Sequence, residues 1–333
     1  MTLRTPYLMF LGDAPDQLAA KTAAGVAHWR PEISAGQFRL PGCRADLGLA
    51  DMTIEEAAAK GVGTVIVGVA NRGGFLGEGW DVPLARALEL GIDLASGLHR
   101  RLSEVETLRE TAARYGRRLV DVRHPTQDFE VANGRKRPGK RLLTVGTDCS
   151  CGKMFTALAL EQEMRARGLK ADFRATGQTG ILIAGSGVSI DAVVADFIPG
   201  AVEWLTPAND PEHWDLIEGQ GSLFHASYAG VSLGLLHGAQ PDALVMCHEP
   251  TRSHMRGLPH FPVPDLAACI ARNIEAAQLT NPGVRCVGLS INTAALGDNA
   301  ARDCLRQTED RLGLPCVDPV RTGVAALVDA LLG

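Results

Sequence analysis

One stretch decides the fold: Leu142-Leu-Thr-Val-Gly146-Thr-Asp-Cys-Ser-Cys-Gly152-Lys153-Met-Phe-Thr-Ala-Leu158. An apolar strand, a glycine turn, a lysine and a helix in this order are typical of a P-loop, where backbone N–H groups and the helix dipole hold phosphate oxygens. The spacing is one residue longer than the common G-x-x-x-x-G-K form. A plain glycine-rich turn is the alternative. We predict that a phosphate-bearing cofactor contacts Gly146, Thr147, Asp148, Cys149, Ser150, Cys151, Gly152, Lys153 and Met154.

The residue after the lysine is Met154. A nucleotide-hydrolysing P-loop has Ser or Thr there, whose hydroxyl ligates Mg²⁺. A thioether is a poor ligand for a hard cation, and Thr156 faces elsewhere on the helix. We therefore expect a loop that grips a cofactor without hydrolysing it, and coenzyme A, with its 3′-phospho-ADP handle, fits. The alternative is that other ligands hold Mg²⁺ and that Met154 is tolerated.

Apolar runs alternate with helical stretches along the whole chain, as in parallel sheets joined by crossover helices. Residues 133–140 combine Gly, Pro and charge, which is typical of an exposed connection between domains. A chain of 333 residues is also long enough for two cores. We predict two doubly wound α/β domains, a Rossmann-like domain over residues 1–134 and a P-loop NTPase-like parallel sheet over residues 141–333.

The apolar runs give the expected strands of the first half, at 7–11, 64–69, 92–95 and 119–122. In the second half they are at 141–145, 170–175, 214–217, 243–247, 284–291 and 315–317. Helical periodicity predicts helices over 16–28, 54–60, 83–90 and 104–115. The segment Ser103-Glu-Val-Glu106 resembles a capping box that begins the last of these helices.

Composition excludes several classes of protein. A net charge of -5 gives no electrostatic reason to expect nucleic acid as a partner. No apolar run reaches the roughly 18 residues of a membrane span, and the N-terminus lacks a signal-peptide pattern, so we expect a cytoplasmic protein. The eight cysteines contain no C-x-x-C pair and are mostly expected to be buried. A homo-oligomer is compatible with the sequence.

Two resemblances follow from these motifs. The Gly-Thr-Asp start of the loop and Glu218-Gly-Gln-Gly-Ser222 are similar to segments of dethiobiotin synthetase. Over nearly its whole length, however, the chain resembles a family with an N-terminal Rossmann-like domain and a C-terminal P-loop domain, whose members act as D-glutamate N-acetyltransferases. The segments that carry this resemblance are 70–74, 146–153, 176–180, 190–196, 218–225 and 230–238.

The family resemblance implies an acyltransferase that moves the acetyl group of acetyl-CoA to the amino group of an acidic amino acid. The implied product is N-acetyl-D-glutamate, in D-glutamate catabolism. Two alternatives stay open. One is an Mg-ATP-dependent ligase or kinase of the dethiobiotin synthetase type, and the other is a non-catalytic protein that senses a nucleotide or coenzyme A.

Acetyl transfer requires a neutral amine, so a general base must accept the ammonium proton. Glu218 and His225 flank a glycine-rich turn after a predicted strand and are our candidate bases. The alternatives are a carboxylate that caps backbone N–H groups and a buried structural histidine. Asp191 is a third candidate catalytic residue, where a carboxylate can bind the substrate's ammonium group or remain a solvated helix charge.

Substrate-binding candidates lie in three loops. Gln178 and Thr179 follow the second strand of the P-loop domain, where backbone donors can stabilise an oxyanion. Arg252 follows a buried strand, and its guanidinium fits a carboxylate or the 3′-phosphate of the cofactor. Asn71 and Arg72 lie beside two glycines, and we expect Arg72 to meet the substrate as the N-terminal domain closes.

We expect no metal, because the three histidines of residues 247–260 match no standard ligand spacing.

Overall fold

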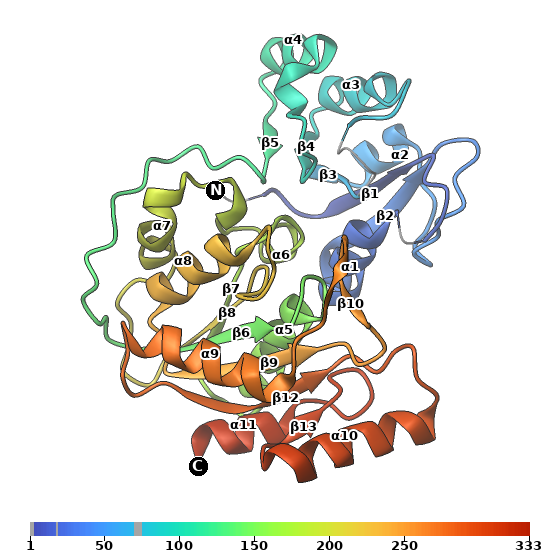
Figure 1. The fold of residues 1–333 in the computed structure, drawn as a ribbon. Helices are drawn as coiled ribbons and strands as arrows, with labels where there is room; N and C mark the ends of the chain where they lie inside the picture. The colour runs from blue at the N-terminus through green and yellow to red at the C-terminus, as the bar shows by residue number, and fades with distance from the viewer. Residues whose placement is uncertain (1–2, 18, 70–74) are drawn as a thin grey trace. The chain divides into compact units, whose positions relative to one another are not determined.

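The computed structural model describes residues 3–17, 19–69 and 75–333 and is drawn in Figure 1. The chain forms two compact units. Unit 1 consists of Met1–Gln127 with Gly177–Ala192, and unit 2 of Asp128–Thr176 with Val193–Gly333. The predicted division into 1–134 and 141–333 did not anticipate that residues 177–192 pack with the N-terminal unit.

Unit 1 is built on five parallel strands in the order β2-β1-β3-β4-β5. Their bounds are β1 Tyr7–Gly12, β2 Ser34–Arg39, β3 Thr64–Val67, β4 Asp93–Ser96 and β5 Leu119–Asp121. This order is that of a doubly wound sheet with its switch point between the first and third strands. The predicted α/β fold is confirmed, while β2 was missed because the sequence SAGQFR contains no apolar run.

The helices of unit 1 are α1 Lys21–Trp29, α2 Ile54–Ala59, α3 Asp81–Glu89, α4 Glu106–Tyr115 and α6 Gln178–Ala184. Helix α1 packs with α6, and α3 packs with α2 and α4. The capping box predicted at Ser103 is wrong. Residues Leu102–Glu104 form a short 3-10 turn, and α4 begins after Val105 without a side-chain cap. A complete capping box is found instead at Thr53 and Glu56 of α2.

Unit 2 is built on six parallel strands in the order β13-β12-β9-β6-β8-β7. Their bounds are β6 Lys140–Gly146, β7 Ala171–Arg174, β8 Trp214–Ile217, β9 Ala243–His248, β12 Arg285–Ile291 and β13 Cys316–Val317. A short antiparallel pair, β10 His254–Met255 and β11 Leu258–Pro262, follows β9. The predicted strands of this half are confirmed within one or two residues, and only the β10–β11 pair was not expected.

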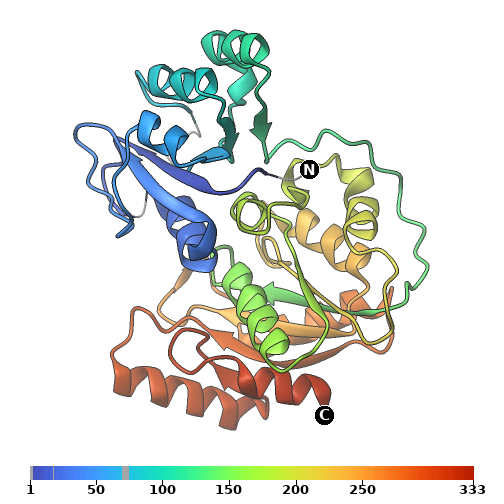
Figure 2. The ribbon, with the colours of Figure 1, turned by 180° about the vertical axis from the view of Figure 1, so that it is seen from behind.

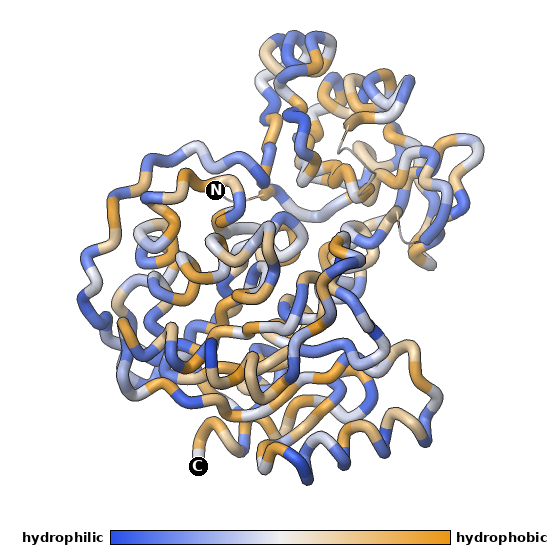
Figure 3. The backbone as a smooth tube through the Cα atoms, in the orientation of Figure 1, coloured by the Kyte–Doolittle hydropathy of each residue, from blue (hydrophilic) through white to orange (hydrophobic). Residues whose placement is uncertain are grey.

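Helices of unit 2 are α5 Lys153–Ala166, α7 Ile198–Leu205, α8 Ala229–Ala239, α9 Leu266–Gln278, α10 Asp298–Leu312 and α11 Ala325–Leu332. Helices α5 and α11 pack together over the sheet (Figure 2) and bury a core that includes Leu160, Val245 and Leu327. Helix α10 mixes polar and apolar residues (Figure 3) and buries only Ala301 and Leu305. None of the helices in the described ranges combines the length and apolar character needed to cross a bilayer.

The basic segment 135–141 is anchored to unit 2, and the prediction of an exposed connection holds for Arg135 but is wrong for Arg137 and Arg141. Arg141 is fully buried, and its guanidinium donates to the carbonyl oxygens of Arg137 and Pro138. Arg137 donates to the carbonyl oxygens of Thr206 and Gly238. Burial lowers the pKa of Arg137 to about 10. Charged side chains that look solvated in the sequence thus satisfy backbone acceptors inside the unit.

Candidate active site

The predicted loop lies between β6 and α5. Strand β6 is an inner strand of the unit 2 sheet, between β9 and β8. Ser150 and Gly152 have left-handed backbone, with φ of 52° and 105°. Alternation of left- and right-handed residues turns successive N–H groups toward one point and makes an anion-binding concavity. The first turn of α5 adds the positive end of its dipole. The order strand, loop and helix is therefore confirmed, with the backbone geometry that a phosphate site needs.

Lys153 is the first residue of α5 and is 6% exposed. Its Nζ donates to the carbonyl oxygen of Asp148 at 2.7 Å, across the mouth of the loop. The stem of the lysine packs on Gly219, where a Cβ would stand 2.9 Å from Lys153 Cδ and 1.7 Å from the Thr144 carbonyl oxygen. Only glycine allows the turn after β8 to approach the loop this closely.

Asp148 is buried and organises the loop from within. Its carboxylate accepts hydrogen bonds from Arg252 Nη1 at 2.5 Å, from the backbone N–H of Arg256 at 2.8 Å and from that of Cys149 at 2.7 Å. Burial alone would raise the pKa of Asp148. The hydrogen bonds from Arg252 and from the two backbone groups outweigh burial, and the pKa lies below its usual value.

Arg252, predicted to bind substrate, has its guanidinium engaged by the loop. Besides Asp148 it donates to the carbonyl oxygens of Cys149 and Ser150, and its Nε donates to Glu249. The side chain is 20% exposed. In this arrangement the guanidinium fixes the conformation of the phosphate loop.

Two further side chains hold the start of the loop, and sequence reasoning missed both. Thr147 Oγ1 lies 2.9 Å from His248 Nδ1. The backbone carbonyl oxygen of Thr147 accepts a hydrogen bond from Ser222 Oγ at 3.1 Å. His248 ends β9 and Ser222 follows β8, the two strands that flank β6. The signal available from the sequence was their place at the carboxyl ends of strands, where ligand sites of α/β sheets lie.

The candidate bases Glu218 and His225 are both buried. Glu218 Oε2 accepts a hydrogen bond from the backbone N–H of Thr176 at 3.0 Å. This contact is the one expected if Glu218 caps a backbone N–H group and is not a general base. His225 Nδ1 accepts from the N–H of Ser227 at 3.1 Å. Its Nε2 therefore carries the hydrogen, which it donates to the carbonyl oxygen of Arg256 at 3.1 Å. Both ring nitrogens of His225 are engaged in this arrangement.

Asp148, Cys149 and His225 each bring one potential ligand atom within 4.8 Å of the others. A cation placed there would compete with the guanidinium of Arg252, which already contacts the Asp148 carboxylate. Burial also raises the pKa of Cys149, which disfavours the thiolate that a metal requires. The donor set therefore fits a metal poorly, and the expectation of no metal stays a prediction.

Met154 is half-buried on the first turn of α5. The nearby hydroxyl of Thr156 is committed elsewhere, because it donates to the Gly152 carbonyl oxygen at 3.0 Å and lies 2.7 Å from Ser290 Oγ in the core. Thr156 thus cannot replace the missing hydroxyl at position 154 without breaking these contacts.

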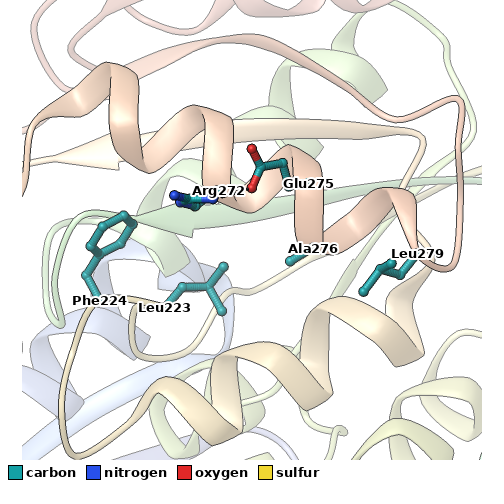
Figure 4. A pocket seen from close by; sticks show the side chains of 6 residues that line it. All are labelled: Leu223, Phe224, Arg272, Glu275, Ala276 and Leu279. Atoms are coloured by element: carbon teal, nitrogen blue, oxygen red, sulfur yellow. Dashed lines mark hydrogen bonds and ion pairs between the residues drawn. The ribbon is translucent and has the colours of Figure 1, made fainter.

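A pocket of about 480 Å³ lies on unit 2 beside the turn after β8 (Figure 4). Four apolar side chains and one exposed ion pair line it: Leu223, Phe224, Ala276 and Leu279, with Arg272 and Glu275. Leu223 directly follows Ser222, whose hydroxyl holds the phosphate loop. The pocket therefore borders the turn whose Ser222 contacts the phosphate loop.

The remaining predicted residues lie in unit 1, apart from Asn71 and Arg72, which fall outside the described residues. Thr179 packs on α1, with its Oγ1 3.5 Å from Thr22 Oγ1. Gln178 and Asp191 come together through a residue that sequence reasoning missed. Arg123 donates to Gln178 Oε1 at 3.1 Å and forms an ion pair with the Asp191 carboxylate.

Comparisons with known proteins agree with this architecture. Residues 38–125 match the model described as "Domain of unknown function (DUF1611_N) Rossmann-like domain", and residues 130–328 match "Domain of unknown function (DUF1611_C) P-loop domain". A crystal structure of a DUF1611 family protein from Anabaena variabilis superposes with a TM-score of 0.86 at 32% identity, with 99% of each chain covered.

Two curated relatives cover nearly the full length. A protein of Tritonibacter scottomollicae named D-glutamate N-acetyltransferase is 57% identical over 99% of both chains. A Pseudoalteromonas protein of the same name is 49% identical over 98% of this chain and 99% of its own. The chain therefore belongs to the D-glutamate N-acetyltransferase family, with its Rossmann-like and P-loop domains, and is an acyltransferase.

Proposed function

We propose that this protein transfers the acetyl group of acetyl-CoA to the amino group of D-glutamate. The observation that carries the proposal is the 57% identity, over 99% of both chains, to a protein named D-glutamate N-acetyltransferase. The product would be N-acetyl-D-glutamate, which removes the free amine and suits a first step of D-glutamate catabolism.

The P-loop of unit 2 supports a donor that carries phosphates. Its left-handed turns and the buried Lys153 provide N–H groups and one positive charge for a diphosphate. With Met154 in place of a hydroxyl, the loop suits binding better than phosphoryl transfer. We assign it the diphosphate of acetyl-CoA.

The pocket beside Phe224 supports the same assignment. It presents apolar surface and an aromatic ring close to the turn that contacts the phosphate loop. Coenzyme A carries the aromatic adenine on one side of its diphosphate and the pantetheine chain, with its apolar carbons, on the other, and an aromatic side chain offers either a packing surface. Phe224→Ala is then expected to raise the KM for acetyl-CoA while leaving the KM for D-glutamate unchanged.

Two measurements test the proposed function. Acetyl-CoA should raise the Tm of the protein without Mg²⁺, because a ligand that binds only the folded state stabilises it. Thiol release from acetyl-CoA should then require D-glutamate. Stabilisation by Mg-ATP alone would instead favour the dethiobiotin synthetase-like alternative, and stabilisation by acetyl-CoA without any thiol release would favour a sensing protein.

A further inference from the structure

A second polar cluster lies in unit 1, at the carboxyl edge of its sheet, where doubly wound folds bind their ligands. Strands β4 and β5 are parallel neighbours, so residues 97–99 and 122–124 leave the sheet at the same edge. His124 Nε2 lies 3.0 Å from the carbonyl oxygen of His99 and ties the two segments together. The cluster therefore rests on adjacent strands of one sheet.

Two opposite charges form an ion pair at the centre of this polar cluster. Arg123 pairs with Asp191, and the two side chains are 18% and 34% exposed. Gln178 Oε1 accepts from Arg123 Nη1, and Ser189 Oγ donates to Asp191 Oδ1 at 2.9 Å. A Cβ at Gly97 would stand 3.0 Å from the Cβ of Gln178, so a small residue lets the amide approach the edge. Arginine and aspartate are thus held in place and remain partly open to solvent.

We propose that Arg123 and Asp191 bind the α-carboxylate and α-ammonium groups of the amino-acid substrate, and that His99 accepts the proton of that ammonium. The assignment rests on the proposed function. A zwitterion carries its two opposite charges on neighbouring atoms, so it can take the place of each partner in the Arg123–Asp191 pair. Neither charge is left unpaired by the exchange. A simple anion would displace Asp191 and leave its carboxylate uncompensated.

The surroundings of His99 suit a base. His99 is exposed at this edge, and partial desolvation with the positive charges of Arg123 and His124 lowers its pKa below the usual value, against an opposing effect of Asp191. The imidazole is therefore mostly neutral at pH 7 and able to accept a proton. By contrast, the ring nitrogens of His225 in unit 2 are both engaged.

The reaction balances with these groups. His99 takes one proton from the ammonium, and the free amine then forms the C–N bond with the acetyl carbonyl carbon. The C–S bond breaks, and the sulfur leaves as a thiolate that takes the second proton lost by the nitrogen. The proton on His99 passes to solvent. The product amide has no positive charge for Asp191, so N-acetyl-D-glutamate should bind more weakly than D-glutamate.

Calorimetric titration of the full chain with D-glutamate in the presence of coenzyme A tests the site without turnover. We expect Arg123→Ala to weaken binding about 100-fold, because a charge-assisted hydrogen-bond pair is lost. Asp191→Asn should weaken it about 10-fold. Arg118→Ala is the matched control, because Arg118 pairs with Asp93 across the same two strands at their opposite ends. The control should bind D-glutamate like the wild type.

His99 is tested by kinetics. His99→Asn should lower kcat about 100-fold with little change in the KM for D-glutamate, and kcat/KM should lose the acidic limb that protonation of His99 causes in the wild type. A structural role would lower Tm or raise KM and would keep that limb.

The two proposals fail separately. If the wild type acetylates D-glutamate and Arg123→Ala keeps its KM and affinity, the amino-acid site is overturned and the proposed function stands. If the wild type binds D-glutamate through Arg123 yet releases no thiol from acetyl-CoA, the proposed function fails and the site stands. Absence of D-glutamate binding to the wild type overturns the site.

Discussion

Arg252 Nη1 lies 2.5 Å from Oδ2 of Asp148, and the pair joins the loop after β9 to the phosphate loop after β6. The same guanidinium holds the carbonyl oxygens of Cys149 and Ser150. Removing it leaves a buried carboxylate with only backbone donors. We expect Arg252→Ala to lower the free energy of unfolding by about 3 kcal/mol and to weaken binding of acetyl-CoA.

Arg256→Ala is the matched control for this prediction, because Arg256 contacts Asp148 through its backbone N–H and not through its side chain. Urea unfolding and titration with acetyl-CoA measure both effects. Equal losses in the two variants would mean that general positive charge, and not the guanidinium contact, holds the loop.

The same pair predicts a pH dependence of stability. The pKa of Asp148 in the folded protein lies below its ordinary value of 3.8. The carboxylate therefore contributes stability that is complete above that value and is lost as the pH falls through the lower folded-state pKa. Unfolding in urea between pH 5 and about pH 2.5 should show this loss in the wild type. Asp148→Asn should flatten the slope, and an unchanged slope would assign the acid sensitivity to other carboxylates.

Much of the fold was predictable because each strand of a parallel sheet with both faces covered must be apolar throughout. Tyr7–Gly12 is a fully buried run of this kind, and Trp214–Ile217 is fully buried with one charged residue, Asp215; both were located from the sequence. Ser34–Arg39 was not, because its pairing with β1 depends on backbone hydrogen bonds and not on an apolar pattern. The assignment of 177–192 to unit 1 was also hidden, because a local pattern does not reveal which sheet a helix packs on.

The residues of the candidate sites also fall into those that the sequence revealed and those that it did not. The phosphate loop is a local motif, so its residues were identifiable from the order of strand, glycine turn, lysine and helix, although its spacing is unusual. The contact between Arg252 and Asp148 joins positions 104 residues apart, and Arg123 meets Asp191 across 68. Nothing within either segment of the sequence specifies its partner. Arg123 was missed because an isolated arginine after a strand carries no motif.

Helix α2 offers a test of local structure. Thr53 Oγ1 accepts from the N–H of Glu56, whose carboxylate accepts from the N–H of Thr53. Thr53→Ala should lower the free energy of unfolding by about 1 kcal/mol, because the backbone N–H of Glu56 in the first turn loses its acceptor. Ser103→Ala is the control, since the cap of α4 uses no side chain. Thermal and urea unfolding should show a smaller effect for Ser103→Ala than for Thr53→Ala.

Met154 gives the sharpest test of how the loop treats nucleotides. A hydroxyl at this position, directly after Lys153, is where Mg²⁺ is ligated in nucleotide-hydrolysing P-loops. Met154→Thr restores that oxygen on the first turn of α5 without touching Thr156, whose hydroxyl is held by Gly152 and Ser290. We expect this variant to gain a rise in Tm with Mg-ATP that the wild type lacks.

Met154→Leu is the matched control for this prediction, because it keeps the apolar volume and adds no oxygen ligand. It should respond to acetyl-CoA and to Mg-ATP as the wild type does, since volume-conserving apolar exchanges are tolerated. A wild type that Mg-ATP stabilises as strongly as Met154→Thr would contradict the role given to this position. Magnesium would then be held by other groups, and the loop would have to be reconsidered as a site of nucleotide chemistry.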